Sequence, residues 1–366
     1  MKKLLCILLI VCLLAGCGAE PAVTTAPTTA PATEPTTAPT TEPTTVPTTE
    51  ATEPPVLYRH PLTGEAISEP YTGRATAVVI DNVINAMPQN GISQADMLFE
   101  FETEGGITRC LAIFTRLAGI ESIGPVRSAR SYFNNIAKSL DAPIIHCGGS
   151  KPGRNGHFDH SGQRIAGWEH IDENAYTRYF YRDQARIDAG YHSWDCLFTT
   201  GDDLLEALAA TEYDWIYEEQ KDYGLLFEPA LELGGETANT IVGTFNAGKT
   251  TTMTYDPATM LYSAAQYDGP HVDGSTGETL TYSNVIAIYT KQWYQNDGTY
   301  DRSFYTLIGE GEGHLACNGQ IVPIRWFRSA LSDPFTFLLE DGTPAVLTVG
   351  RTYVGVFPTR YQVQYS

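Results

Sequence analysis

The stretch ADMLFEFETEGGITRCLAIFTRLAGIESIGPVRSARSYFNNIAKSL, residues 95–140, predicts two strands joined by a turn and followed by a helix. Before its two glycines, apolar and acidic residues alternate with the period of two that marks a strand. A two-residue turn at these glycines places Phe101 opposite Cys110 and Glu102 opposite Arg109. We therefore expect a hairpin with one apolar face and, near its tip, a charged pair on the other face.

The end of the same stretch has helical spacing, because apolar residues recur every three or four positions from Phe133 onward. We expect this helix to span residues 129–140, with Ser128 as its N-cap. Arg127 and Arg130 then flank the helix N-terminus, where free N–H groups already favour an anion. Two arginines at this end indicate that a negative group compensates them.

Residues 1–17 are typical of an exported lipoprotein. Two lysines precede an apolar run, residues 4–14, that is too short to remain as a membrane-spanning helix. The following LAGC resembles a bacterial lipobox, which implies cleavage after residue 16 and lipid, including palmitate, on Cys17. We expect a lipid-anchored protein on the extracytoplasmic face of the cell membrane. The alternative is an ordinary secretory signal with a chance cysteine.

From residue 20 to residue 55 the chain is nearly all Thr, Pro, Ala and Glu. This composition buries no apolar surface and predicts an unfolded, locally polyproline-like tether. Beyond it, residues 74–82 and 143–147 are typical of buried strands, and Thr200 is a natural N-cap for a helix that continues through Ala210. Asp81 and Asn82 end the first of these strands, a common position for a site in α/β domains.

The C-terminal half has a different pattern, with strands separated by Asp-Gly, Asn-Gly and Asp-Pro turns. The expected strands are residues 238–245, 250–255, 281–290, 303–308, 321–327 and 352–357. We therefore expect a signal peptide at residues 1–16, a disordered tether at 17–55, an α/β or α+β N-terminal domain with a central mixed sheet at 56–233, and a smaller β-rich C-terminal domain at 234–366.

The formal net charge of −20 makes binding to nucleic acid unfavourable. Between Arg59 and Arg186, however, eleven arginines occur with only two lysines. The arginine fork suits phosphate and carboxylate groups, whereas a solvated surface contains more lysine. A set of structural arginine–carboxylate pairs is the alternative interpretation.

The remaining chemical motifs are few. The sequence has no Gly-x-Ser-x-Gly, His-Glu-x-x-His, Walker loop or Cys-x-x-Cys. We expect Cys110, Cys147, Cys196 and Cys317 to be mostly buried thiols, with room for one disulfide in an oxidising compartment. A glycine-rich stretch with His157, Asp159 and His160, together with His146, could supply metal ligands, although solvated side chains are the more common outcome.

Several long motifs occur in the order known from one family. AVVIDN, MPQNGISQADMLFEFETEGGITRCLAIF, IGPVRSARSYF, YFYRDQAR and the C-terminal W…DG…GRTYVGV resemble the YerB-like bacterial lipoproteins, a two-domain family of unknown function. The resemblance covers most of residues 57–358. It implies a cellular location and a two-domain organisation, but no reaction. The chain departs from the family pattern at Met87, where arginine is usual, at Ser131, where proline is usual, and at residues 191–193, where Pro-His-Asn is usual.

Two functions remain open. The first is a receptor without a cofactor, anchored to the membrane by its lipid, whose arginine-lined cleft binds an anionic cell-wall polymer, precursor or partner. The second is a transferase of phosphoryl or glycosyl-phosphoryl groups acting on lipid-pyrophosphate-linked precursors. It is suggested by a resemblance in motif order to the LytR-CpsA-Psr ligases, and Asp81 and Asp96 would hold Mg²⁺. The candidate ligand-binding residues are Asp81, Asn82, Asp96, Glu102, Arg109, Arg127, Arg130, Arg182 and Arg186.

Overall fold

The computed structural model describes residues 58–150, 169–229, 231–296 and 301–366. Several expected features lie outside these ranges: the signal peptide, the proposed lipidation at Cys17, the tether, and the candidate metal ligands His157, Asp159 and His160. Among the helices that the structure does describe, none is both long enough and apolar enough to cross a bilayer.

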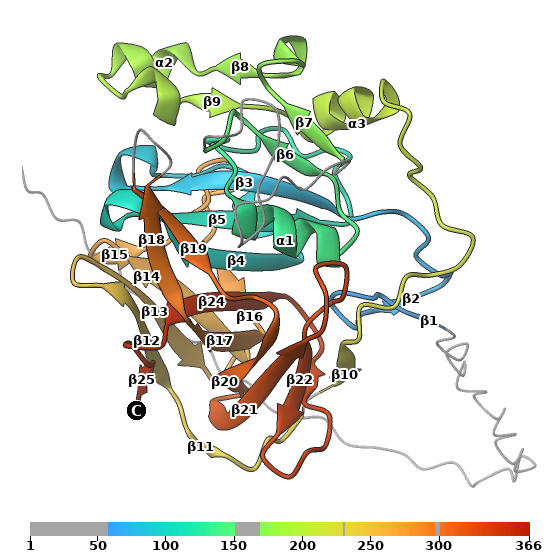
Figure 1. The fold of residues 1–366 in the computed structure, drawn as a ribbon, viewed down its shortest axis with the longest axis vertical. Helices are drawn as coiled ribbons and strands as arrows, with labels where there is room; N and C mark the ends of the chain where they lie inside the picture. The colour runs from blue at the N-terminus through green and yellow to red at the C-terminus, as the bar shows by residue number, and fades with distance from the viewer. Residues whose placement is uncertain (1–57, 151–168, 230, 297–300) are drawn as a thin grey trace, which may run out of the picture. The chain divides into compact units, whose positions relative to one another are not determined.

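A mixed sheet of eleven strands runs through the folded part (Figure 1). In spatial order its strands are β11 (Glu236–Thr237), β21 (Gln320–Arg328), β20 (Gly309–Cys317), β17 (Asn284–Thr290), β24 (Thr352–Pro358), β4 (Met97–Glu102), β5 (Thr108–Phe114), β3 (Thr76–Asn82), β6 (Ile144–His146) and β7 (His170–Asp172), with β22 (Thr336–Leu339) paired to β21. β24 lies between β17 and β4 and is parallel to both. The two halves of the chain therefore share one sheet.

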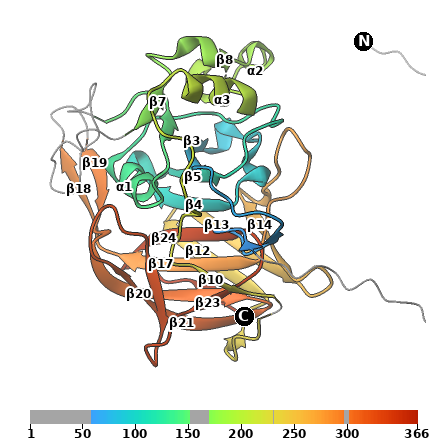
Figure 2. The same cartoon turned by 90° about the vertical axis from the view of Figure 1, so that its right-hand side faces the viewer.

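A second sheet contains only strands from the C-terminal half (Figure 2). Its strands are β15 (Gly269–Pro270), β14 (Leu261–Gln266), β13 (Lys249–Asp256), β12 (Thr240–Asn246) and β25 (Gln364–Tyr365), with β16 (Thr281–Tyr282) paired to β14. The expected mixed central sheet and the β-rich C-terminal part are confirmed. The boundary between residues 233 and 234 stays a prediction.

The remaining described elements are short. Four two-stranded ribbons pair β1 (Tyr58–Arg59) with β2 (Ala66–Ile67), β10 (Leu226–Glu228) with β23 (Val346–Thr348), β18 (Gln292–Asn296) with β19 (Asp301–Tyr305), and β8 (Tyr181–Arg182) with β9 (Leu197–Phe198). The helices are α1 (Ser131–Ser139), α2 (Gln184–Asp188) and α3 (Gly201–Ala209), with 3-10 turns at Ile84–Ala86, Ile92–Gln94, Glu104–Gly106, Thr177–Tyr179 and Ser193–Asp195.

The central sheet is buried on both faces, which explains why β3, β4 and β5 are apolar on both sides. Helix α1 covers one face, where Phe133 and Ile136 pack in one apolar cluster with Phe101. The second sheet covers the other face, where Phe245 of β12 belongs to the same cluster as Leu98 of β4. Each face therefore excludes water from any polar side chain that it carries.

The hairpin register differs from the sequence prediction by one residue. Phe101 lies opposite Arg109 and Glu102 lies opposite Thr108, so the expected pairs Glu102–Arg109 and Phe101–Cys110 are wrong. The turn is longer than two residues, because Glu104–Gly106 forms a 3-10 turn in which both glycines have positive φ. A slip of one residue turns side chains to the other face of a strand. Arg109 therefore lies on the α1 face, and Glu102 lies on the opposite face.

Helix α1 begins at Ser131, two residues later than expected, with Arg130 and not Ser128 in the N-cap position. The preceding residues are held in extended pairing. The Arg127 N–H donates to Val79 O at 2.8 Å, and the Ala129 N–H donates to Gly148 O at 3.1 Å. Because these backbone groups bond to neighbouring segments, the chain cannot turn into a helix earlier. The expected helix after Thr200 is confirmed as α3, with the Asp203 N–H donating to Thr200 Oγ1 at 2.9 Å.

The single strand expected at residues 281–290 is divided, because β16 pairs with β14 in the second sheet and β17 joins the central sheet.

All four cysteines of the folded part are free thiols. Cys147 is half-buried, and the other three are buried.

Candidate functional site

One edge of the central sheet collects polar side chains from several segments. Strands β3, β6 and β7 are mutually parallel, so their carboxyl ends meet at this edge with Asp81, His146 and Asp172. Strand β5 is antiparallel to β3 and contributes Arg109, directly opposite Asp81. The carboxyl edge of parallel strands is where sites form most often in α/β proteins.

Arg127 contacts two carboxyl groups at this edge. Its Nε donates to Asp81 Oδ2 at 2.7 Å, and its second guanidinium nitrogen lies 3.9 Å from Asp195 Oδ1. The Asp81 and Asp195 side chains are 1% and 4% exposed, whereas 24% of the Arg127 side chain is exposed. Burial and the Asp81 charge raise the pKa of Asp195. Arg127 is therefore the part of this group that solvent reaches.

Arg130 is satisfied by a neighbouring carboxylate. Its Nε and second terminal nitrogen donate to Glu104 at 2.7 and 2.9 Å, and Arg302 lies 3.6 Å from the same carboxylate. Burial alone would raise the pKa of Glu104, but the hydrogen bonds and charge of Arg130 hold it below its usual value. Arg130 therefore matches the alternative interpretation of a structural arginine–carboxylate pair.

Arg109 is different, because it has no carboxylate within ion-pair distance among the described residues. Only 5% of the residue is exposed. One terminal nitrogen donates to Ser128 O at 2.9 Å, while its Nε is buried without a hydrogen-bond partner. Burial and the nearby charge of Arg130 lower the pKa of Arg109 to about 9. A buried guanidinium in this state is costly unless an anion compensates it.

We call these six residues the arginine cluster: Asp81, Glu104, Arg109, Arg127, Arg130 and Asp195. Of the candidate residues, the structure brings together Asp81, Arg109, Arg127 and Arg130. It also places three carboxyl groups among the three arginines, so the group is not a simple positive patch. The sequence alone does not indicate the roles of Glu104 and Asp195, because their arginine partners are distant in sequence.

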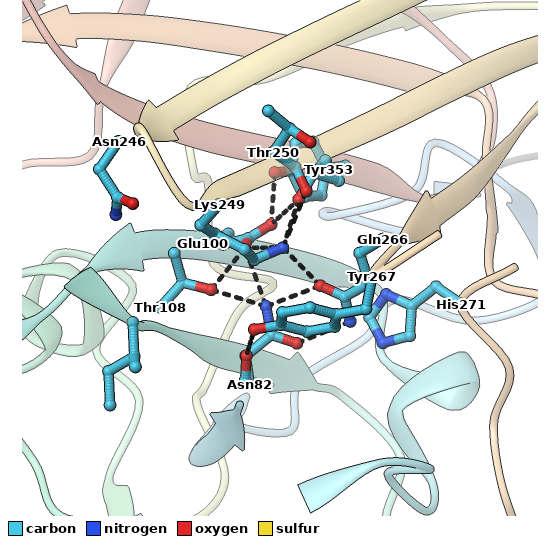
Figure 3. A network of polar contacts seen from close by, with 12 residues as sticks. Asn82, Glu100, Thr108, Asn246, Lys249, Thr250, Gln266, Tyr267, His271 and Tyr353 are labelled. Atoms are coloured by element: carbon cyan, nitrogen blue, oxygen red, sulfur yellow. Dashed lines mark hydrogen bonds and ion pairs between the residues drawn. The ribbon is translucent and has the colours of Figure 1, made fainter. Parts of the chain in front are cut away.

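Asn82 and Glu102 lie on the opposite face of the sheet. Asn82 donates to Glu100 and Gln266, and Tyr267 donates to its carbonyl at 2.6 Å (Figure 3). The Glu102 carboxylate lies 3.5 Å from Arg360 and accepts hydrogen bonds from side chains of the C-terminal half: Asn246, Gln292 and Tyr294. Neither residue reaches the arginine cluster, because the alternation of a strand points neighbours to opposite faces.

Asp96 lies at the other end of the sheet. Its N–H donates to Ile113 O, four positions beyond Arg109 on β5, which corresponds to about 14 Å at roughly 3.4 Å per residue. Its carboxylate accepts from the N–H and the hydroxyl of Thr115 at 2.7 and 2.6 Å. Asp81 and Asp96 therefore cannot hold the same Mg²⁺ ion, as the transferase hypothesis requires. Within the described ranges, no group of three or more His, Cys, Asp or Glu side chains is arranged to hold a metal ion.

Arg182 and Arg186 do not share a helix face as the sequence suggests, since Arg182 belongs to β8 and only Arg186 belongs to α2. Arg182 donates to Ser193 O at 2.6 Å. Arg186 donates to Ala86 O at 3.2 Å and to Pro88 O at 2.5 Å. Both arginines therefore brace backbone segments beside the cluster.

A deeply buried ion pair joins the two halves of the chain (Figure 3). Lys249 Nζ lies 3.1 Å from Glu100 Oε1, and both side chains are at most 3% exposed. The Glu100 carboxylate also accepts from three hydroxyls, those of Thr108, Thr251 and Tyr353, at 2.7–2.9 Å. Although burial alone would raise the pKa of Glu100, the Lys249 charge and these hydrogen bonds lower it. All its groups are satisfied within the protein, so we interpret this network as a structural junction.

We expect two buried histidines, His146 and His271, to make the folded protein less stable in mild acid. Burial lowers the pKa of His146 and of His271 to about 4, whereas an unfolded histidine titrates near 6.5. Their stabilising contribution is therefore complete above pH 6.5 and decreases as the pH falls toward 4, because only the unfolded chain binds the protons. We expect the free energy of unfolding, measured with urea, to decrease steadily from pH 7 to pH 5. His271→Gln should flatten this dependence.

The two halves of the chain match known family domains. Residues 62–214 match the N-terminal domain, and residues 241–354 match the C-terminal domain, of a protein of unknown function (DUF3048). The chain therefore belongs to this two-domain, YerB-like family, as its motifs indicate.

One relative is "Putative lipoprotein YerB" of Bacillus subtilis (strain 168), which is 28% identical over 316 residues, covering 81% of this chain and 86% of the relative. The crystal structure of the YerB protein from Bacillus subtilis matches with a TM-score of 0.70 and 24% identity, over 84% of this chain and 99% of that chain. This second likeness concerns the fold alone.

Proposed function

We propose that the protein is a lipid-anchored receptor of the cell envelope that binds an anionic group, such as a phosphate of a cell-wall polymer or precursor, at the arginine cluster. The observation that carries the proposal is Arg109, a buried guanidinium with an unpartnered Nε and, among the residues that the structure describes, no carboxylate within ion-pair distance. An arginine network that served only the fold would pair each guanidinium, as Arg130 is paired with Glu104.

Arg127 would be the first residue of the cluster that an anion from solvent contacts. This residue is the most exposed arginine of the cluster and holds Asp81, which lies opposite Arg109. A phosphate that contacts Arg127 would meet a planar fork suited to bidentate hydrogen bonds. The positive charges of Arg109 and Arg130 behind it would add attraction in a poorly solvated environment.

The proposal is tested by calorimetric titration of the full mature chain with pyrophosphate. Arg127→Lys keeps a positive charge beside Asp81, so the fold should be retained. It removes the planar guanidinium, and one charge-assisted hydrogen bond to the pyrophosphate is lost. Such a bond contributes about 1.5–3 kcal/mol, and we expect binding to weaken roughly tenfold to 150-fold. Arg325→Lys, at an exposed pair with Glu310, is the matched control and should bind as the wild type does. Equal binding by Arg127→Lys and wild type would contradict the proposal, as would the absence of pyrophosphate binding.

The lipid anchor is a separate prediction. The lipobox and the preceding apolar run support cleavage before Cys17 and acylation of its side chain and amino group. We expect Cys17→Ala to leave the protein unprocessed or released from the membrane. Mass spectrometry of the wild-type N-terminus checks this directly, and an intact Met1 or a different mature N-terminus would contradict it.

A further inference from the structure

A small cavity lies beside the arginine cluster. Its volume is about 250 Å³, and it is lined by Ile84, Asn85, Ala189, Gly190, Tyr191 and His192. One wall follows β3 and begins three residues after Asp81. The other wall ends three residues before Asp195. Both walls are therefore continuous with segments of the cluster.

The walls of the cavity are held in place by Arg186. Its guanidinium donates to the carbonyls of Ala86 and Pro88 on one wall. The same group lies over the ring of Tyr191 on the other wall, 5.9 Å from the ring centroid. The ring of Phe198 packs against it at 4.8 Å. The cavity is thus preformed, which reduces the entropy lost when a ligand binds.

The lining defines the chemistry of a ligand. It contains no carboxylate, ammonium or guanidinium group, which favours a neutral molecule. Asn85 supplies both donors and an acceptor, while aromatic rings supply flat apolar faces. His192, one of the lining residues, stacks on Trp194 with ring centroids 4.5 Å apart and an interplanar angle of 18°. Trp194 and Ile84 remain 51% and 60% exposed.

The geometry points to a subsite for one neutral sugar ring of an envelope glycan. A pyranose has an apolar face of C–H groups that packs on aromatic rings and a periphery of hydroxyls that bond to an amide. The volume is below the roughly 300–1,000 Å³ of pockets for drug-sized ligands, so it suits a single ring. A glycan seated here would carry a neighbouring phosphate toward Arg127. This last step alone rests on the proposed anion-binding function.

The test uses the full mature chain and an uncharged probe, the β-1,4-linked tetramer of N-acetylglucosamine, with saturation-transfer NMR. Saturation transfer from the wild type is expected, with binding at least tenfold weaker in His192→Ala and in Trp194→Ala. Tyr58→Ala removes a ring that is 39% exposed on β1, outside the cavity lining, and should not change binding. Arg127→Lys should also keep the sugar signal.

The outcomes separate the two proposals. No transfer from the wild type, or equal transfer in His192→Ala and Trp194→Ala, would overturn the sugar subsite. Binding of N-acetylphenylalaninamide in place of the sugar would overturn it as well and would indicate a peptide ligand. Sugar binding that persists in a protein that does not bind pyrophosphate would support the subsite and remove the proposed anion-binding function.

Discussion

Replacing Lys249 by methionine is expected to lower the free energy of unfolding by about 3–5 kcal/mol. The substitution leaves the Glu100 carboxylate buried between two sheets without its cation, and the side chain has no path to water at 3% exposure. It also removes the donor that Gln266 Oε1 and Thr251 Oγ1 accept from, at 2.5 and 2.9 Å. Because these groups come from both sheets, we expect both halves of the chain to unfold together.

Two comparisons make this prediction specific. Arg325→Met breaks an ion pair of similar length, 2.8 Å to Glu310, whose side chains are 53% and 58% exposed, and it should cost at most about 1 kcal/mol. The double variant Glu100→Gln with Lys249→Met should be more stable than Lys249→Met alone, because no uncompensated charge remains. Urea denaturation followed by tryptophan fluorescence measures all three. If Lys249→Met costs no more than Arg325→Met, the network does not join the sheets as inferred.

Strands and helices can be predicted from the sequence where the signal lies in neighbouring residues. Alternation over residues 97–102 predicts β4, and Thr200 predicts the start of α3 through its own side chain. The register of β4 and β5 was not accessible. The register depends on the turn between the strands, which is a 3-10 turn at Glu104–Gly106. The two glycines permit both this turn and a shorter two-residue turn. A register that is wrong by one residue predicts the Arg109 side chain on the wrong face of the sheet.

The site was accessible only in part for the same reason. Asp81 at the end of a buried strand and Arg127 before a helix are local signals, and the structure joins them at 2.7 Å. Asp195 is more than one hundred positions from Asp81, and no local pattern indicates that the chain returns to this edge. Lys249 likewise follows an unremarkable Ala-Gly dipeptide, yet it meets Glu100 across two sheets. Such pairs are set by topology.

The sharpest prediction concerns Arg109, where ligand binding and stability should change in opposite directions. Arg109→Met removes a buried cation that has no carboxylate within ion-pair distance in the described part of the chain. It puts a flexible apolar side chain beside Phe101, which lies opposite residue 109 in the hairpin. Removing such a buried charge is expected to raise the free energy of unfolding by about 1–2 kcal/mol, at the lower end of the range found when buried ion pairs are replaced by apolar residues. Proteins accept this kind of local instability where a site needs it.

The same variant should lose pyrophosphate binding, because the charge that the anion would compensate is gone. We expect at least a tenfold weaker association, corresponding to about 1.4 kcal/mol or more. Arg130→Met is the matched control, since Arg130 already has Glu104 within 2.7 Å, and its removal should destabilise the fold by leaving that carboxylate with only the longer contact to Arg302, at 3.6 Å. A melt and a titration on each protein separate the two roles. If Arg109→Met unfolds more easily than the wild type, Arg109 serves the fold, and the anion site must be sought elsewhere.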